Sequence, residues 1–362
     1  MKKVHEPFPF YEFSGTEREI GRQIGEEMRE QVRSVIPYWF DVLSTIFPDK
    51  LEDMIATCKK FEAPAKEYAP ELWDEIVGIA EGANMTTDEI LFIQGGWELD
   101  SCGPAAFGCT DFACSGQATK DGKTIVGQNF DWYPNAPTIV ERIHPKGKPS
   151  YLTVTWPGHL AQVGLSESGF GMFINLLLTK DNGRVGVPYA FICNKILYQK
   201  NVPDAIRAVT QSNAASSFDY TIAGKDGEIV NVEVSASSTR GVKCGIVLPD
   251  RDILAHSNHY LTHYLQPYCE NDQSSFPDSW LREYRMRQLM ENHRGELTPE
   301  IFMNEILQDH RGYPDSICRH CDLTGPIGEQ FDTVFSCVGI PAEGKLYSVN
   351  NPCENPYKLY TL

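Results

Sequence analysis

The sequence predicts an α+β protein in which antiparallel β-sheets are covered by helices. The first hundred residues carry helical hydrophobic periodicity, whereas strand-like segments joined at glycine-containing turns dominate from Gly103 onward. Further helices are expected between and after those hairpins. Hairpins grouped around helices favour antiparallel sheets with helices packed outside over a doubly wound parallel sheet.

Three helices are expected within residues 1–100. The first carries a stripe of apolar residues at four-residue steps, namely Ile20, Ile24, Met28 and Val32. The other two fit residues 70–84 and 86–96. Capping-box pairs mark the start of the first and third helices: Thr16 with Glu19, and Thr86 with Glu89. Gly21 and Gly25 are spaced to permit close packing against another element.

Three β-hairpins are predicted from the turn pairs Asp121-Gly122, Lys146-Gly147 and Asp226-Gly227. Helices are expected between the second and third hairpins and again near the C-terminal end, over 188–200, 202–212, 278–293 and 298–310. If the first hairpin is unbulged, Cys109 lies opposite Pro134, and Asp131 opposite Phe112. The returning strand therefore brings an acid close to the cysteine end.

Composition limits the function classes. The chain has 362 residues, of which 41% are hydrophobic, so an ordered protein of two lobes is plausible. A net charge of −17 argues against nucleic-acid and anionic-membrane partners. The N-terminal segment lacks the apolar region of a signal peptide, and no apolar run is long enough to span a membrane. Eleven cysteines without a secretion signal predict reduced thiols and a cytoplasmic location.

The segment "AAFGCTDFACSG" places Cys109 at the first residue of a strand, directly after Gly108. That position suits a residue that becomes a new N-terminus. If the preceding bond is cut, Cys109 carries both a thiol and an α-amine of pKa about 7.7–8.0. The amine can act as general base for the thiol, so no catalytic histidine is needed. A glycine before the nucleophile leaves its carbonyl open to attack.

The segment "GCTDFACSG…DGKTIVGQNFDW" resembles the isopenicillin N acyltransferase-like N-terminal-nucleophile hydrolases, peptidase family C45, which are relatives of choloylglycine hydrolases and penicillin V acylases. Other blocks resemble that family in the expected order, namely "EREIGRQIGE", "ELWDEIVGIAEGANMTTDEIL", "SESGFGMFINLL", "ILAHSNHYL", "DSWLREYR", "DHRGYPDSICRH" and "NNPCENPY". The resemblance covers nearly the whole chain. It implies a four-layer α-β-β-α sandwich preceded by a helical propeptide, with residues 1–108 as propeptide or α-subunit and 109–362 as catalytic β-subunit.

The resemblance also implies roles for individual residues. Cys109 is expected to act in self-processing at Gly108 and as the acyl-forming nucleophile. Roles around it fall to Asp131 as the acid that orients the α-amine, Asn258 and Asn175 as oxyanion-site residues, Arg282 as the residue that holds the nucleophile region, and Ser235 as a processing-related serine of loose spacing. No cofactor and no metal are expected.

Other interpretations of these residues stay open. Cys102 and Cys114 are nearby cysteines, but one follows a serine and the other lies in mid-strand. A papain-like pair would join Cys109 to His256 or His259. The "CRHC" motif could bind zinc, with ligands drawn from Cys318, Cys321, Cys337 and Cys353. A second possible metal site is a helically spaced stripe of histidine ligands at His256, His259 and His263.

The predicted function is therefore acyl transfer through a Cys109 thioester from a small non-peptidic or modified-peptide amide. Water as acceptor gives an amidase, and an amine gives an acyltransferase. The alternatives are an acyl-CoA-dependent amine N-acyltransferase, which the acidic charge disfavours, and an unprocessed, non-catalytic binding protein. The expected partner is a small-molecule amide. The two processed fragments should stay associated, and a higher oligomer is possible.

Overall fold

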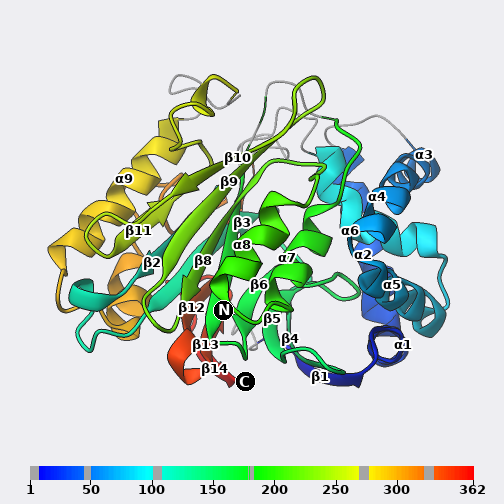
Figure 1. Cartoon of the computed structure of the whole chain (residues 1–362), viewed down its shortest axis with the longest axis horizontal. Helices are drawn as coiled ribbons and strands as arrows, with labels where there is room; N and C mark the ends of the chain where they lie inside the picture. The colour runs from blue at the N-terminus through cyan, green and yellow to red at the C-terminus, as the bar shows by residue number, and fades with distance from the viewer. Residues whose placement is uncertain are drawn as a thin grey trace.

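The computed structural model describes residues 8–44, 50–100, 108–177, 179, 183–268, 277–321 and 330–362, except the side chains of Trp97 and Asp100. These residues form two β-sheets and a set of N-terminal helices, so the predicted α+β class is confirmed. In Figure 1 the N-terminal helices gather on the right, beside the sheets. Among the described residues, no helix combines the length and apolarity needed to cross a membrane.

The first sheet has eight strands in the order β1-β4-β5-β6-β7-β8-β9-β10. Their bounds are Phe10–Gly15, Ile139–Pro145, Tyr151–Thr155, Val163–Ser166, Phe170–Leu176, Phe218–Gly224, Ile229–Ser237 and Gly241–Val247. β1 is a correction to the all-helical expectation for residues 1–100. It pairs in parallel with β4, which is distant in sequence, so local periodicity did not reveal it.

The second sheet has six strands in the order β11-β2-β3-β12-β13-β14. Their bounds are Ile253–His256, Cys109–Cys114, Ile125–Trp132, Asp332–Ile340, Lys345–Val349 and Lys358–Thr361. The two sheets meet between β3 and β7, where the buried Gln128 side chain donates to the carbonyl of Ile174 at 3.1 Å and accepts from its N–H at 3.1 Å. The core therefore lies between the sheets and continues under the helices.

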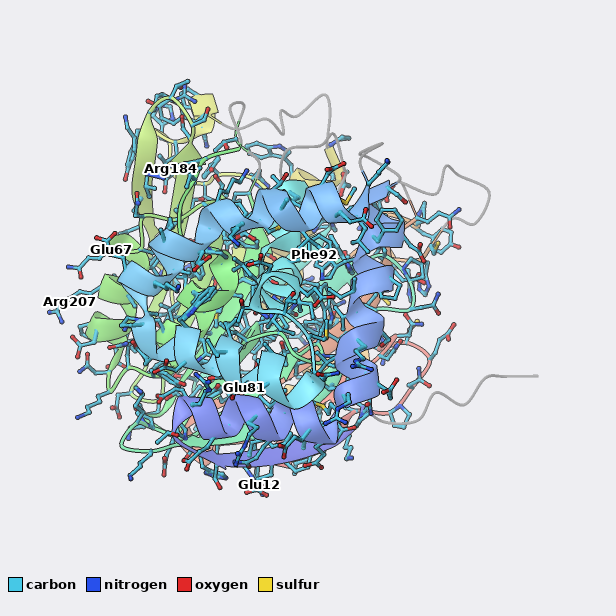
Figure 2. All side chains as sticks on the ribbon, turned by 90° about the vertical axis from the view of Figure 1, so that its right-hand side faces the viewer. Glu12, Glu67, Glu81, Phe92, Arg184 and Arg207 are labelled. Atoms are coloured by element: carbon cyan, nitrogen blue, oxygen red, sulfur yellow. The ribbon has the colours of Figure 1, made fainter. Side chains whose placement is uncertain are left out.

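The N-terminal helices are α1 to α6, with bounds Glu17–Glu27, Arg29–Ser44, Leu51–Cys58, Glu62–Tyr68, Pro70–Ala83 and Thr87–Asp100. Figure 2 looks onto this side, where helices surround the buried Phe92, while Glu12 and Arg207 lie at the rim. The helices α7, Tyr189–Leu197, and α8, Val202–Thr210, lie in front of the first sheet in Figure 1. α9, Pro277–Asn292, packs against β11 and β2 of the second sheet.

The expected capping boxes and close helix contact are confirmed. Thr16 and Glu19 form a reciprocal capping box at the start of α1. A Cβ atom added to Gly21 would lie 2.1 Å from the carbonyl oxygen of Glu75, and one added to Gly25 would lie 2.4 Å from that of Ile79. Glycine therefore lets the backbones of α1 and α5 touch.

The second and third hairpins turn where predicted, but the first does not. Cys109 pairs with Phe130 and Cys114 with Ile125, so the strand register differs from the unbulged alignment. The connection contains a 3₁₀ turn at Gly116–Ala118, and the N–H of Gly116 donates to Gly122 O at 3.2 Å. Asp131 consequently follows the cross-strand neighbour of Cys109, closer to the thiol than the sequence-based register placed it.

Candidate active site

Cys109 is the first residue of β2 and is 1% exposed. Its backbone N–H donates to Asn258 Oδ1 at 2.9 Å. Its carbonyl oxygen accepts from Ser257 Oγ at 3.1 Å and from Arg282 Nη1 at 2.5 Å. The thiol Sγ lies 3.8 Å from the carbonyl oxygen of Asp131. Both backbone polar groups of Cys109 are thus held by side chains rather than by the sheet alone.

Gly108 lies in a position that has no room for a side chain. A Cβ atom there would lie 2.7 Å from Asp131 Oδ2 and 2.7 Å from Arg319 Nε. These distances are shorter than real Cβ contacts allow, so any larger residue would displace the acid or the guanidinium. The glycine therefore brings the backbone before Cys109 directly against the charged pair.

Asp131 is fully buried on β3. Thr333 Oγ1 donates to its Oδ1 at 2.7 Å, and Arg319 Nε lies 3.5 Å from its Oδ2. Burial raises the pKa of this carboxyl to about 7, although Arg319, Arg282 and the Thr333 hydrogen bond oppose the rise. Its protonation state can therefore change near neutral pH.

Burial also raises the pKa of the Cys109 thiol, and the nearby Asp131 charge adds to this effect against the opposing influence of Arg282. In the continuous chain the thiol is consequently protonated at neutral pH. A nucleophilic thiolate would have to form by transfer of this proton during the reaction or after a change in the surroundings of Cys109.

Asn258 and Arg282 connect Cys109 to the neighbouring elements. Asn258 follows β11, and its Nδ2 donates to the carbonyl of Leu176 at 3.0 Å. Arg282 lies on α9 and is buried; its Nη2 donates to Asn258 Oδ1 at 2.9 Å and its Nη1 to Thr110 Oγ1 at 2.9 Å. The same guanidinium therefore fixes Cys109 and the asparagine that contacts it.

Two predicted residues lie elsewhere in the interior. Asn175, on β7, donates through Nδ2 to Asp219 Oδ2 at 3.2 Å. Ser235 lies on β9, opposite Lys243 of β10. Within the described part of the chain, no hydrogen bond joins either side chain to Gly108 or Cys109. Their assigned roles stay predictions.

The histidines proposed as alternative bases are held by other groups. His256 Nε2 lies 2.9 Å from Glu233 Oε1, and its Nδ1 lies 3.3 Å from Asp219 Oδ1. Although burial opposes the shift, these acids raise the pKa of His256 well above its usual value. Burial lowers the pKa of His259 to about 2, and its Nδ1 contacts Ser279 Oγ at 2.8 Å.

The raised pKa favours the imidazolium form of His256, and the lowered pKa favours the neutral form of His259. The expected helical stripe is wrong, because His256 ends strand β11 and His259 follows it in a turn. The inward-facing Asp111, Asp219 and Glu233 that surround His256 were not identified from the sequence. The sequence signal that could have identified these residues is an acid within an otherwise apolar strand, as in β2, β8 and β9.

Sequence reasoning also missed Arg319, Ser257, Asp278 and Thr333 as neighbours of the site. Arg319 Nη2 lies 2.7 Å from Asp278 Oδ2, and Asp278 also pairs with Arg282 at 3.1 Å. Although burial opposes it, the two guanidinium groups hold the pKa of Asp278 below its usual value. Asp278 thereby links the arginine beside Asp131 to the arginine beside Cys109. Arg319 lies in the quoted "SICRH" block, which was the available signal.

A cleft of about 520 Å³ adjoins the outer side of this network. It is lined by Pro277, Asp278, Leu281, Arg282, Tyr284, Arg285, Gln288, Arg311, Gly312 and Asp315. Its size falls within the range of small-molecule sites. Its lining carries three arginines and two aspartates, and Arg282 and Arg285 are ion-paired with Asp278 and Asp309.

Comparison with known proteins gives one family. Residues 117–349 match the family described as "Acyl-coenzyme A:6-aminopenicillanic acid acyl-transferase". The acyl-coenzyme A:6-aminopenicillanic-acid-acyltransferase 40 kDa form of Emericella nidulans is 26% identical over 344 residues, which cover 94% of this chain and 93% of that protein.

Similar solved structures include a bile acid hydrolase and a penicillin acylase. A variant of the conjugated bile acid hydrolase from Clostridium perfringens is 13% identical, with a TM-score of 0.49 over 70% of this chain and 97% of that one. Penicillin V acylase from Agrobacterium tumefaciens is 11% identical, with a TM-score of 0.46 over 67% of this chain and 83% of that one.

Proposed function

We propose that Cys109 cleaves the peptide bond on its own N-terminal side and then serves as the nucleophile of an amide-cleaving acyl-transfer enzyme. The chain belongs to the acyl-coenzyme A:6-aminopenicillanic acid acyl-transferase family. The observation that supports this function best is the set of bonds on Cys109. Asn258 accepts from its N–H, while Ser257 and Arg282 donate to its carbonyl. These contacts fix the backbone on the C-terminal side of the bond to be cut.

Self-cleavage begins with attack of Cys109 Sγ on the carbonyl carbon of Gly108. The C–N bond breaks as the C–S bond forms, the thiol proton passes to the departing amine, and a thioester results. Water then hydrolyses the thioester, which restores the thiol and leaves a carboxylate on Gly108. The missing side chain at Gly108 supports this step, because a residue without a Cβ adds no side-chain atom beside the carbonyl carbon that is attacked.

The released α-amine would lie where the Cys109 N–H now contacts Asn258, with the buried Asp131 nearby. It can take the thiol proton as general base. The thiolate then attacks the carbonyl carbon of the substrate amide. Our candidate donors to the resulting oxyanion are Asn258 and Asn175. The substrate amine leaves after it is protonated. Water or an acceptor amine finally resolves the thioester.

We further propose that the fold is the four-layer sandwich of N-terminal-nucleophile hydrolases and that fragments 1–108 and 109–362 stay together after cleavage. Buried contacts across the cut support this association. Tyr189 N donates to Glu98 Oε1 at 2.7 Å, and Leu160 N donates to Gln94 Oε1 at 2.8 Å. Strand β1 also completes the first sheet through β4. Co-elution of both fragments in size-exclusion chromatography would support the proposal, and separation without denaturant would contradict it.

Intact mass and N-terminal sequencing test the cleavage. We expect the wild type to yield fragments 1–108 and 109–362 and Cys109→Ala to stay whole. Cys109→Ser should process slowly, because a hydroxyl is a weaker nucleophile. Cys114→Ala, in the same strand, is the matched control and should process normally. A new N-terminus at any residue other than Cys109 would overturn the assignment.

A second candidate is an acyl-CoA-dependent amine N-acyltransferase, favoured by the arginine-lined cleft and by the name of the Emericella nidulans relative. The phosphates of CoA would contact Arg285 or Arg311 at the cleft. Incubation of processed enzyme with an acyl-CoA and an amine decides between the candidates. Amide formation that weakens in Arg311→Ala supports the transferase, whereas hydrolysis of an amide without use of acyl-CoA supports the amidase.

A further inference from the structure

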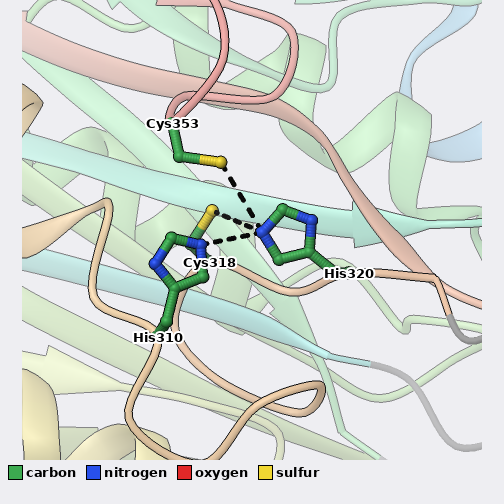
Figure 3. Close-up of side chains that lie close together, drawn as sticks. All are labelled: His310, Cys318, His320 and Cys353. Carbon is green, nitrogen blue, oxygen red and sulfur yellow. Dashed lines mark hydrogen bonds between the residues drawn. The ribbon is translucent and has the colours of Figure 1, made fainter.

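We propose that His310, Cys318, His320 and Cys353 bind one zinc ion, in a site separate from Cys109. Figure 3 shows the four side chains pointing toward one another from two segments, with Cys353 on one and the other three residues on the loop 310–320. Their ligand atoms all lie within 4.8 Å of one another. His320 Nε2 lies 3.7 Å from Cys318 Sγ, 3.6 Å from Cys353 Sγ and 2.8 Å from His310 Nε2.

The spacing agrees with tetrahedral zinc. Zn–N bonds of about 2.0–2.1 Å and Zn–S bonds of about 2.3 Å, at a tetrahedral angle, separate nitrogen from sulfur by about 3.6 Å. Both nitrogen-to-sulfur distances from His320 match this value. The two imidazole nitrogens would need to separate to about 3.3 Å, which a small rotation of the exposed His310 permits.

The chemistry of the four groups selects the metal and its role. Two thiolates and two imidazoles suit zinc and exclude the hard cations magnesium and calcium, which prefer oxygen ligands. Four protein ligands fill a tetrahedral shell and leave no position for substrate, as in structural zinc sites. Binding would displace the thiol protons of Cys318 and Cys353 to solvent.

These ligands differ from those expected of the CxxC motif. Cys321 lies outside the cluster, and its Sγ contacts Gln330 Oε1 at 3.9 Å. Cys337 lies on β12, where its Sγ contacts Ser348 Oγ at 3.4 Å. The chain instead brings Cys353, from the turn after β13, to the His310–His320 segment. The tertiary structure therefore places Cys353 beside Cys318, where the CxxC motif predicted Cys321.

The zinc site would also position a residue of the candidate active site. Arg319 lies between Cys318 and His320, and its guanidinium reaches Asp131 and Asp278. Its backbone N–H donates to Thr333 Oγ1 at 2.9 Å, and that hydroxyl donates to Asp131. One zinc ion bound by Cys318 and His320, the residues on either side of Arg319, would hold the Arg319 side chain against Gly108. This consequence rests on the function proposed for Cys109, whereas zinc binding does not.

Metal analysis of the purified full chain, after dialysis against metal-free buffer, tests the site. We expect one zinc per chain in the wild type and almost none in Cys318→Ser and Cys353→Ser. Cys321→Ser is the matched control and should keep its zinc. Wild-type protein without stoichiometric zinc, or equal loss in Cys321→Ser, would overturn the proposal. Copper in place of zinc at these four residues would overturn the choice of metal.

A second measurement does not depend on whether the variants fold. Chelator-treated wild type, kept reduced, should gain several degrees in Tm when zinc is added and nothing when magnesium is added. Cobalt in place of zinc should give the visible absorption of tetrahedral thiolate ligation. A Cys318–Cys353 disulfide in freshly purified protein, or no Tm response to zinc in fully reduced protein, would contradict a zinc site. Slower self-cleavage of the zinc-free wild type, restored by zinc, tests the link to Cys109 separately.

Discussion

Two regions of this protein use glycine for close approach, and they differ in what the glycine meets. Between α1 and α5, a Cβ on Gly25 would lie 2.4 Å from the carbonyl oxygen of Ile79. Before Cys109, a Cβ on Gly108 would lie 2.7 Å from atoms of the Asp131 and Arg319 side chains. Backbone atoms of a packed helix cannot move aside, whereas side-chain ends can.

The comparison separates stability from chemistry. The helix contact holds two elements at a fixed distance, so its loss is a loss of folding free energy. The Gly108 contact sets the position of an acid and an arginine beside the proposed cleavage bond, so its loss changes a rate. Four substitutions test this division, from the largest expected effect to the smallest.

The largest effect should come from Asn258→Ala in the processed enzyme. Loss of one preorganised oxyanion donor costs about 10²–10³ in turnover. We expect that loss in steady-state rate with the circular dichroism spectrum of the wild type. The Tm should fall, because Cys109 N–H, Arg282 and the Leu176 carbonyl each lose a buried partner. A loss of less than tenfold in folded protein would move the donor role elsewhere, with Asn175 the next residue to test.

Gly25→Ala should instead lower stability. The added methyl overlaps the α5 backbone, and overpacking of a tight contact costs about 1–3 kcal/mol, sometimes more. We expect a loss at the upper end of that range in urea unfolding, measured in the uncut Cys109→Ala background. Glu27→Ala, at an exposed position of the same helix, is the control and should change stability by less than about 0.5 kcal/mol. Equal stability of both variants would contradict the helix contact.

The third substitution concerns pH. Burial raises the pKa of Asp131 from 3.8 to about 7 in the folded chain, so the protonated acid stabilises folding at low pH. That contribution is lost as the pH rises from about 4 through about 7. In the uncut Cys109→Ala background, the free energy of unfolding should fall over this range by a few kcal/mol more than in the double variant with Asp131→Asn. Parallel pH curves would show that Asp131 is ionised throughout.

Gly108→Ala should have the smallest effect on stability and a clear effect on cleavage. The added methyl meets side-chain ends rather than backbone, so we expect a loss of unfolding free energy at the low end of the about 1–3 kcal/mol that overpacking costs. Their displacement should slow self-cleavage about tenfold or more, measured as the half-life of the uncut chain. Cleavage at the wild-type rate would show that close approach at Gly108 is not needed.

Much of the molecule follows from local sequence. Helix periodicity and capping pairs placed α1, α5 and α6, and turn pairs placed the second and third hairpins, because these signals act between residues close in the chain. The stripe from Ile20 to Val32, expected on one helix, spans two, because α1 ends at Glu27 and α2 begins at Arg29. The Gly-Cys junction and the ordered motifs identified Cys109 as a candidate nucleophile and indicated the family. Gly21 and Gly25 predicted a close contact, although not its partner.

Tertiary structure decided what depends on distant segments. The first hairpin has a register that differs from that of a two-residue Asp-Gly turn, and its connection contains a 3₁₀ turn and a bond from Ser115 N to Asp252 O of a distant segment. The pKa of Asp131 is raised because the folded chain buries it, which no local pattern encodes. Cys353, and not the nearby Cys321, lies beside Cys318 because two loops that are distant in sequence meet in space. Periodicity and turn chemistry report neighbours along the chain, whereas burial, register and side-chain clusters depend on which distant segments fold together.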